Sequence, residues 1–182
     1  MRNSRAGRSH VASGVAIAIV VLTVATAHGA AQHRIDRAQV VRALINLEAQ
    51  ALDGGNWTYD RIQGRITLVD FWATWCAPCL RELPYLKRAR AKYGDDFRVL
   101  GISLDRMSRR DLTNWLRRHS VGWPQIHAND GYSDAIAVDF GIDRLPTNLL
   151  LDRHGRVRAL DVRGDDLFAE VDALIAESLV SE

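Results

Sequence analysis

The chain has few cysteines and, apart from three N-terminal arginines, no surplus of positive charge, and each shortage excludes a class of protein. Only two of the 182 residues are cysteines, so a disulfide-stapled secreted scaffold is excluded. Without Arg2, Arg5 and Arg8, the 24 basic residues fall to 21, against 22 acidic ones. That balance gives no basic surface for nucleic acid, and no nucleic-acid partner is expected. The sequence also has no internal repeat and no low-complexity segment.

Acidic residues are absent from residues 1–31, which carry three arginines before an uncharged run. The run spans residues 11–27 and is followed by small residues, the layout of a secretory signal peptide. Its 17 residues are slightly fewer than the roughly 20 that cross a bilayer, so an uncleaved anchor is the alternative and would tether the protein through residues 11–27. A lipoprotein anchor is excluded because no cysteine lies near the cleavage region. In both cases the rest of the chain is exported, for example to the periplasm, where disulfides persist.

We expect three regions: residues 1–31 as signal peptide or anchor, residues 32–56 as a helical extension, and residues 57–182 as an α/β domain. Apolar spacing predicts helices over Arg34–Leu52, Cys79–Tyr93, Ser108–His119, Ser133–Phe140 and Asp165–Leu179. Apolar runs predict strands over Trp57–Ile62, Ile66–Trp72, Phe97–Leu104, Thr147–Leu151 and Val157–Val162. Early alternation of strands and helices followed by a hairpin at residues 152–155 indicates a mixed β-sheet flanked by helices.

The two cysteines, Cys76 and Cys79, lie between the strand Ile66–Trp72 and the helix that follows it. The unpaired N–H groups and partial positive charge of a helix N-terminus stabilise a thiolate and lower the pKa of a cysteine there. A second cysteine three positions later lies about one helical turn away. The arrangement therefore permits a reversible disulfide, whereas a purely structural bond closing so small a loop would add little stability.

Several segments together resemble one known family. They are the segment Leu68–Cys79, the run Trp75-Cys76-Ala77-Pro78-Cys79 with Glu82 and Pro84 after it, Gly101–Asp105, Gly141–Thr147, Leu150–Asp152 and Gly155. As a set they resemble the exported TlpA/ResA-type thiol–disulfide oxidoreductases of the thioredoxin-like superfamily. The resemblance implies a thioredoxin-like mixed sheet, here with an N-terminal signal or anchor segment and an extra helix. It also implies that the Leu145–Pro146 bond is cis and lies beside Cys76.

The same resemblance assigns chemistry to four residues. Cys76 is the expected attacking thiolate, and Cys79 the residue that resolves the mixed disulfide. Asp70 lies within an apolar strand, so burial should raise the pKa of its carboxyl, which would then accept the proton of Cys79. Glu82 is expected to tune the acidity of the thiols or to shape the substrate groove. The alternatives are a salt-bridged or edge-exposed Asp70 and a solvated Glu82.

Substrate contacts are expected on both sides of the cysteines. Trp75 would form an apolar platform, and Pro78 would restrict the turn between the cysteines. Leu145 and Pro146 would present backbone to an extended substrate segment, a form of strand addition.

The expected function is reduction of specific exported protein disulfides, such as the haem-binding cysteines in cytochrome c maturation. An upstream membrane or exported thiol would donate electrons, and no cofactor or metal is expected. The reducing direction follows from the resemblance alone. One alternative is copper delivery, although that class spaces its cysteines by three residues and adds a histidine. Another is a peroxiredoxin-like peroxidase, although Thr74 and Arg81 are not where that class needs them.

Overall fold

A five-stranded mixed sheet forms the centre of the computed structural model, which describes residues 36–180. The expectations for residues 1–31 lie outside that range. The strand order is β5-β4-β3-β6-β7, where β3 and β4 are parallel, β4 and β5 are parallel, and β6 runs antiparallel to both β3 and β7. Their bounds are β3 Ile66–Trp72, β4 Phe97–Ser103, β5 Gln125–His127, β6 Thr147–Leu151 and β7 Val157–Leu160. The expected mixed sheet is confirmed.

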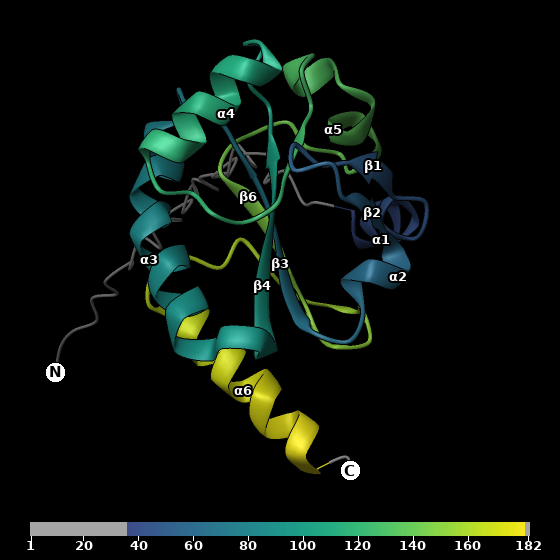
Figure 1. The fold of residues 1–182 in the computed structure, drawn as a ribbon. Helices are drawn as coiled ribbons and strands as arrows, with labels where there is room; N and C mark the ends of the chain where they lie inside the picture. The colour runs from purple at the N-terminus through teal and green to yellow at the C-terminus, as the bar shows by residue number, and fades with distance from the viewer. Residues whose placement is uncertain (1–35, 181–182) are drawn as a thin grey trace, which may run out of the picture. The chain divides into compact units, whose positions relative to one another are not determined.

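Helices cover both faces of this sheet (Figure 1). One core lies beneath α3 (Ala77–Tyr93), α4 (Arg109–Arg118) and α6 (Asp166–Val180). The opposite core includes α1 (Arg37–Ile45), α2 (Tyr59–Ile62), α5 (Ala135–Asp139) and the small antiparallel pair β1 (Glu48–Gln50) and β2 (Asn56–Thr58). Two 3₁₀ turns, Gly94–Asp96 and Gly131–Ser133, complete the elements of the described chain.

Strand β3 is the middle strand of the sheet, and all seven of its residues are buried. Its side chains alternate between the two cores: Leu68 and Trp72 pack beneath α3, whereas Val69 and Phe71 pack on the other face. Asp70 falls between Leu68 and Trp72 and so lies on the face covered by α3. The sheet thereby places a carboxyl beneath the helix that carries the cysteines.

The predicted N-terminal helix and the strand after it were partly wrong. The helix ends at Ile45 rather than Leu52, and Glu48–Gln50 forms β1. The expected strand Trp57–Ile62 stops at Thr58, after which Tyr59–Ile62 is helical. Pairing of β1 with β2 outweighs the helical spacing of the sequence here, because Ala51 and Trp57 become buried against the sheet.

Besides shifts of one or two residues at other element ends, two elements differ in extent from the sequence prediction and one strand was missed. The helix expected over Ser133–Phe140 is divided into a 3₁₀ turn and the five-residue α5. Strand β7 ends at Leu160, before Asp161 adopts a left-handed conformation with φ 55°. Strand β5 was not predicted, because a three-residue strand is too short to show alternation.

The segment before β2 packs directly on the domain. Val40, Leu44 and Ala51 are buried in the core beneath α1 and α5. Ala51 forms a β-bridge with Ile126, and the Leu52 N–H donates to the Gln125 carbonyl at 2.7 Å. Within residues 36–180, the longest helices lack the combination of length and apolar character needed to cross a membrane.

Candidate active site

The two cysteines form a disulfide at the N-terminus of α3. The Sγ atoms are 2.03 Å apart, and Cys76 and Cys79 are 5% and 3% exposed. Cys76 is the N-cap of α3, and its sulfur accepts the Cys79 N–H at 3.3 Å. Pro78 occupies the first turn of the helix, where its missing N–H leaves no intrahelical bond unmade. An N–H of the helix end is therefore already directed at the Cys76 sulfur.

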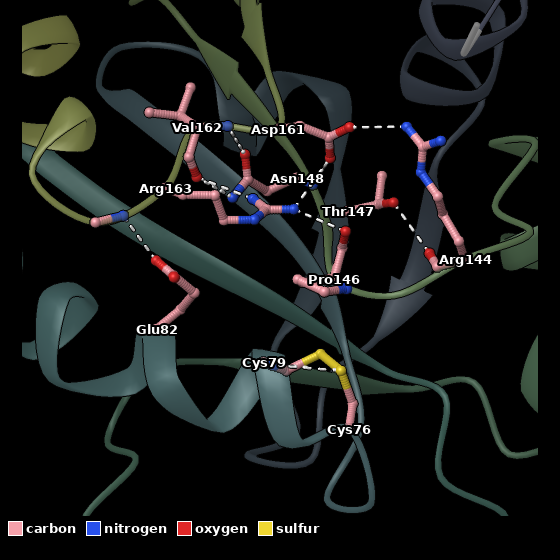
Figure 2. A network of polar contacts seen from close by, with 11 residues as sticks. Cys76, Cys79, Glu82, Arg144, Pro146, Thr147, Asn148, Asp161, Val162 and Arg163 are labelled. Atoms are coloured by element: carbon pink, nitrogen blue, oxygen red, sulfur yellow. Dashed lines mark hydrogen bonds and ion pairs between the residues drawn. A yellow bond between two sulfur atoms is a disulfide. The ribbon is translucent and has the colours of Figure 1, made fainter. Parts of the chain in front are cut away.

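The Leu145–Pro146 peptide bond is cis, as expected. It lies immediately before β6, whose Thr147 pairs with Phe71 of β3. Figure 2 shows Pro146 facing the disulfide across the site. The Thr147 hydroxyl donates to the Arg144 carbonyl at 3.0 Å and so closes the turn that contains this bond.

Asp70 carries a buried carboxyl in the central strand β3. It is 6% exposed, and its strand neighbours in register are Gly101 and Asn148, both uncharged. Burial raises the pKa of Asp70 to about 7, the charge of Arg163 lowers it, and the charge of Glu82 raises it. The expected rise is confirmed, and an exposed or salt-bridged edge position for Asp70 is wrong.

Glu82 is half-buried on α3, one turn after Cys79. Its Oε2 accepts the N–H of Gly164 at 2.8 Å, in the loop between β7 and α6 (Figure 2). This hydrogen bond holds the Glu82 carboxylate against the β7–α6 loop. The alternative, in which Glu82 is only a solvated charge on the surface of the helix, is therefore wrong.

Trp75 immediately precedes Cys76 and is 59% exposed. Its ring lies 6.4 Å from that of Tyr132. Both rings line a cavity of about 550 Å³, which also includes Thr74, Leu104, Asp105, Arg106, Met107 and Gly131. The exposed Trp75 ring, next in sequence to Cys76, therefore lines a cavity of mixed apolar and polar character.

Asp105 and Arg163 were not among the predicted site residues. Asp105 is 1% exposed, accepts the Thr74 N–H and hydroxyl at 3.0 and 2.7 Å, and so fixes the loop before Cys76. Asp105 is the last residue of the Gly101–Asp105 segment, and this motif is the feature of the sequence that could have identified it as a site residue. No local pattern distinguishes Arg163 from the other arginines.

Among residues 36–180, no group of three or more His, Cys, Asp or Glu side chains is placed to hold a metal ion.

Residues 40–160 match the model of the AhpC/TSA family. The chain belongs to that family. It is 24% identical over 123 residues to the thiol–disulfide oxidoreductase ResA of Bacillus anthracis, covering 67% of this chain and 69% of the relative. The thioredoxin-like protein YneN of Bacillus subtilis is 24% identical over 115 residues, 62% of this chain and 65% of its own length.

Solved structures agree with this assignment. A thiol–disulfide oxidoreductase from Bacteroides fragilis superposes with a TM-score of 0.62 at 30% identity, over 70% of this chain and 96% of its own. The structure of MTB dsbF, in mixed oxidized and reduced forms, gives 0.60 at 27% identity, over 72% and 97%. The AhpC/TSA protein described here is therefore a thiol–disulfide oxidoreductase of thioredoxin-like fold, and the ResA-type resemblance is confirmed.

Proposed function

We propose that this oxidoreductase is exported and reduces specific protein disulfides through the Cys76–Cys79 couple. The observation that carries the proposal is the buried disulfide at the N-terminus of α3, facing the cis Leu145–Pro146 bond. Haem-binding cysteines of exported apocytochromes are one substrate class with the required chemistry. A membrane or exported thiol donor would restore the dithiol, and residues 11–27 would direct or tether the chain.

The reaction consists of two exchanges. The Cys76 thiolate attacks a substrate disulfide, forms a mixed disulfide and releases one substrate sulfur, which takes up a proton. Cys79 then transfers its proton to Asp70, and the resulting thiolate attacks the Cys76 sulfur. The mixed disulfide breaks, the second substrate sulfur leaves as a thiol after protonation, and the enzyme is left oxidised. Two electrons have passed to the substrate.

The site geometry supports these roles. The Cys79 N–H directed at the Cys76 sulfur, with the positive end of α3, stabilises a thiolate at Cys76. A buried carboxyl with a pKa near 7 exists in both protonation states at neutral pH, as a proton acceptor for Cys79 requires. Glu82, fixed by Gly164, adds negative charge beside Asp70 and so increases its proton affinity.

Substrate binding would use the surface around the disulfide. Leu145 and Pro146 are half-buried and offer backbone for pairing with an extended substrate segment. Trp75 and the exposed Pro78 supply apolar contact beside the cysteine. These contacts would favour a polypeptide over a small disulfide.

Dithiothreitol-driven reduction of insulin tests the proposal. We expect the parent protein to accelerate the reaction and the variant with both Cys76→Ser and Cys79→Ser to show none of this acceleration. Cys79→Ser alone should accumulate a mixed disulfide with insulin, because no thiol remains to resolve it. Full activity in the double variant would contradict the proposal.

Direction is tested by the reduction potential of the Cys76–Cys79 couple. A reductant should lie near the thioredoxin value of about −270 mV, and an oxidant near about −120 mV. The part of the site that the structure describes gives no support to the two alternative functions. The Thr74 hydroxyl already donates to Asp105, and Arg81 is exposed on α3. Tight stoichiometric copper binding without reductase activity would support copper delivery, and rapid cysteine-dependent peroxide turnover would support a peroxidase.

A further inference from the structure

The loop between β7 and α6 connects the two halves of the site. Val162 bonds Asn148 of β6 in both directions: its N–H donates to Oδ1 at 2.9 Å, and its carbonyl accepts from Nδ2 at 2.8 Å. Two residues later, Gly164 donates to Glu82 of α3. Arg163 lies between these anchored residues, so its backbone is fixed relative to both the cis-proline strand and the cysteine helix.

The Arg163 side chain turns into the site rather than into solvent and is 26% exposed (Figure 2). Nη2 donates to the Pro146 carbonyl at 2.7 Å and to Asp161 Oδ1 at 3.1 Å, and Nη1 donates to the Val162 carbonyl at 2.9 Å. A planar guanidinium can serve these three acceptors at once, whereas a lysine ammonium cannot match that fork. The carbonyl it holds belongs to the proline that faces the disulfide.

The charge of the same guanidinium lowers the pKa of Asp70. Two charged groups act on this carboxyl: Arg163 from the β7–α6 loop and Glu82 from α3. The neighbouring strands contribute uncharged Gly101 and Asn148, and the cysteines of α3 are uncharged as a disulfide. Asp161 partly neutralises Arg163 and is itself paired on its exposed side with Arg144. Within residues 36–180, Arg163 is thus the cation whose charge lowers the pKa of Asp70.

We propose that Arg163 is a positioning residue of the thiol exchange, because one guanidinium, fixed by the β7–α6 loop, holds the Pro146 carbonyl and brings a positive charge into the site of Asp70. The catalytic part of this inference rests on the proposed function. Without Arg163, Asp70 would retain its proton to higher pH, and Cys79 would need a higher pH to attack. The Pro146 carbonyl would also lose its partner, so the edge that pairs with substrate would be less well held.

The first test measures the titration of the Asp70 carboxyl and does not depend on enzymatic activity. The ¹³C carboxyl signal of Asp70, identified by its loss in Asp70→Asn, is titrated in the oxidised full-length protein. Arg163→Gln should raise the midpoint by about one pH unit, and Arg163→Lys by less, because it keeps the charge. Arg144→Gln is the matched control: it removes an Asp161 ion pair but no Pro146 bond, and should leave the midpoint unchanged. An unchanged midpoint in Arg163→Gln overturns the proposal.

The second test connects the charge to the reaction. A mixed disulfide of Cys76 with thionitrobenzoate is prepared, and release of the coloured thiolate by Cys79 is followed across neutral pH. We expect the pH midpoint of release to rise in Arg163→Gln by the same amount as in the carboxyl titration. Equal slowing of the Gln and Lys variants at every pH, without a midpoint shift, indicates a purely structural role and overturns the proposal.

Failure of the proposed function is recognised separately. If the parent protein releases no thionitrobenzoate at any pH, Cys79 does not resolve the mixed disulfide and the proposed mechanism is wrong, whatever the carboxyl titration shows. Circular dichroism of Arg163→Lys and Arg163→Gln confirms that the compared proteins are folded. If Arg163→Gln does not fold, Arg163→Lys carries the test: it must still raise the titration midpoint and the release midpoint together.

Discussion

At the scale of single residues, the protein keeps a carboxyl where an apolar side chain would be expected. Asp70 is buried between Leu68 and Trp72 on β3, the strand at the centre of the sheet. Burial disfavours its charged form and raises its pKa from 3.8 to about 7. The folded protein therefore binds a proton that the unfolded chain has already released between these two values.

This raised pKa predicts how stability depends on pH. The protonated Asp70 contributes its full stabilisation below about pH 4. This contribution falls as the pH rises from 4 to about 7 and does not change further above pH 7. The total decrease in the free energy of unfolding is about 4 kcal/mol. Urea unfolding of the oxidised protein at acidic and mildly alkaline pH measures the difference. Asp70→Asn should remove most of it and be more stable than the parent at alkaline pH. An undiminished difference in the variant would assign the pH dependence to other groups.

At the scale of elements, the turn of the β6–β7 hairpin also supports α2. The Asp152 carboxylate accepts the N–H groups of His154 and Arg156 at 2.9 and 3.0 Å. Gly155 has φ 74°, as the turn requires, and the Tyr59 hydroxyl of α2 donates to the His154 carbonyl at 3.3 Å. A Cβ on Gly155 would lie 2.9 Å from the Tyr59 ring, so turn and helix share one close contact.

Gly155→Ala should therefore destabilise the fold more than a comparable glycine change. Gly64→Ala is the control: Gly64 also has a positive φ, 84°, but nothing lies within 4 Å of its Cβ position. We expect Gly64→Ala to cost about 1–2 kcal/mol from backbone strain alone. Gly155→Ala should cost a further 1–3 kcal/mol or so, because Tyr59 must move. Denaturant unfolding of the two variants measures this, and equal losses would show that Tyr59 moves freely.

At the scale of the whole molecule, the sheet carries a separate core on each face. The active site belongs to the face beneath α3, while the segment from α1 to β2 completes the opposite face. Leu44 of α1 is 1% exposed in that core, whereas its neighbour Val41 is 43% exposed. The packing indicates that this N-terminal segment unfolds together with the sheet.

Leu44→Ala tests that cooperativity. A cavity in a packed core should lower the free energy of unfolding by about 2–5 kcal/mol. Val41→Ala, one turn away on the exposed side of α1, should change it by no more than about 0.5 kcal/mol. Tryptophan fluorescence should report one transition in both variants, because Trp57 and Trp72 lie in opposite cores. A small effect of Leu44→Ala would make residues 36–56 an independent appendage.

Much of the fold could be predicted because its signals are local. The unbroken apolar run of β3, the helical spacing after Cys79 and the turn residues before Gly155 each determine their own element. Two of the errors fall on short strands that exist only through pairing: β1 pairs with β2, and β5 pairs with β4 over three residues. A strand of three residues is too short for its apolar–polar alternation to be distinguished from a helix or a loop.

The sequence by itself determined the chemistry: the closely spaced cysteines between strand and helix, the buried position of Asp70, and the proline that lies opposite. Only the tertiary structure decided how these groups are held and charged. Glu82 accepts a hydrogen bond from Gly164, which lies 82 positions later in the chain, and Arg163 donates to the carbonyl of Pro146, which lies 17 positions earlier. A local pattern records which residues are apolar and how they are spaced. It does not record which arginine will fold back onto a distant carbonyl, because that depends on where the sheet and α6 place the loop between them.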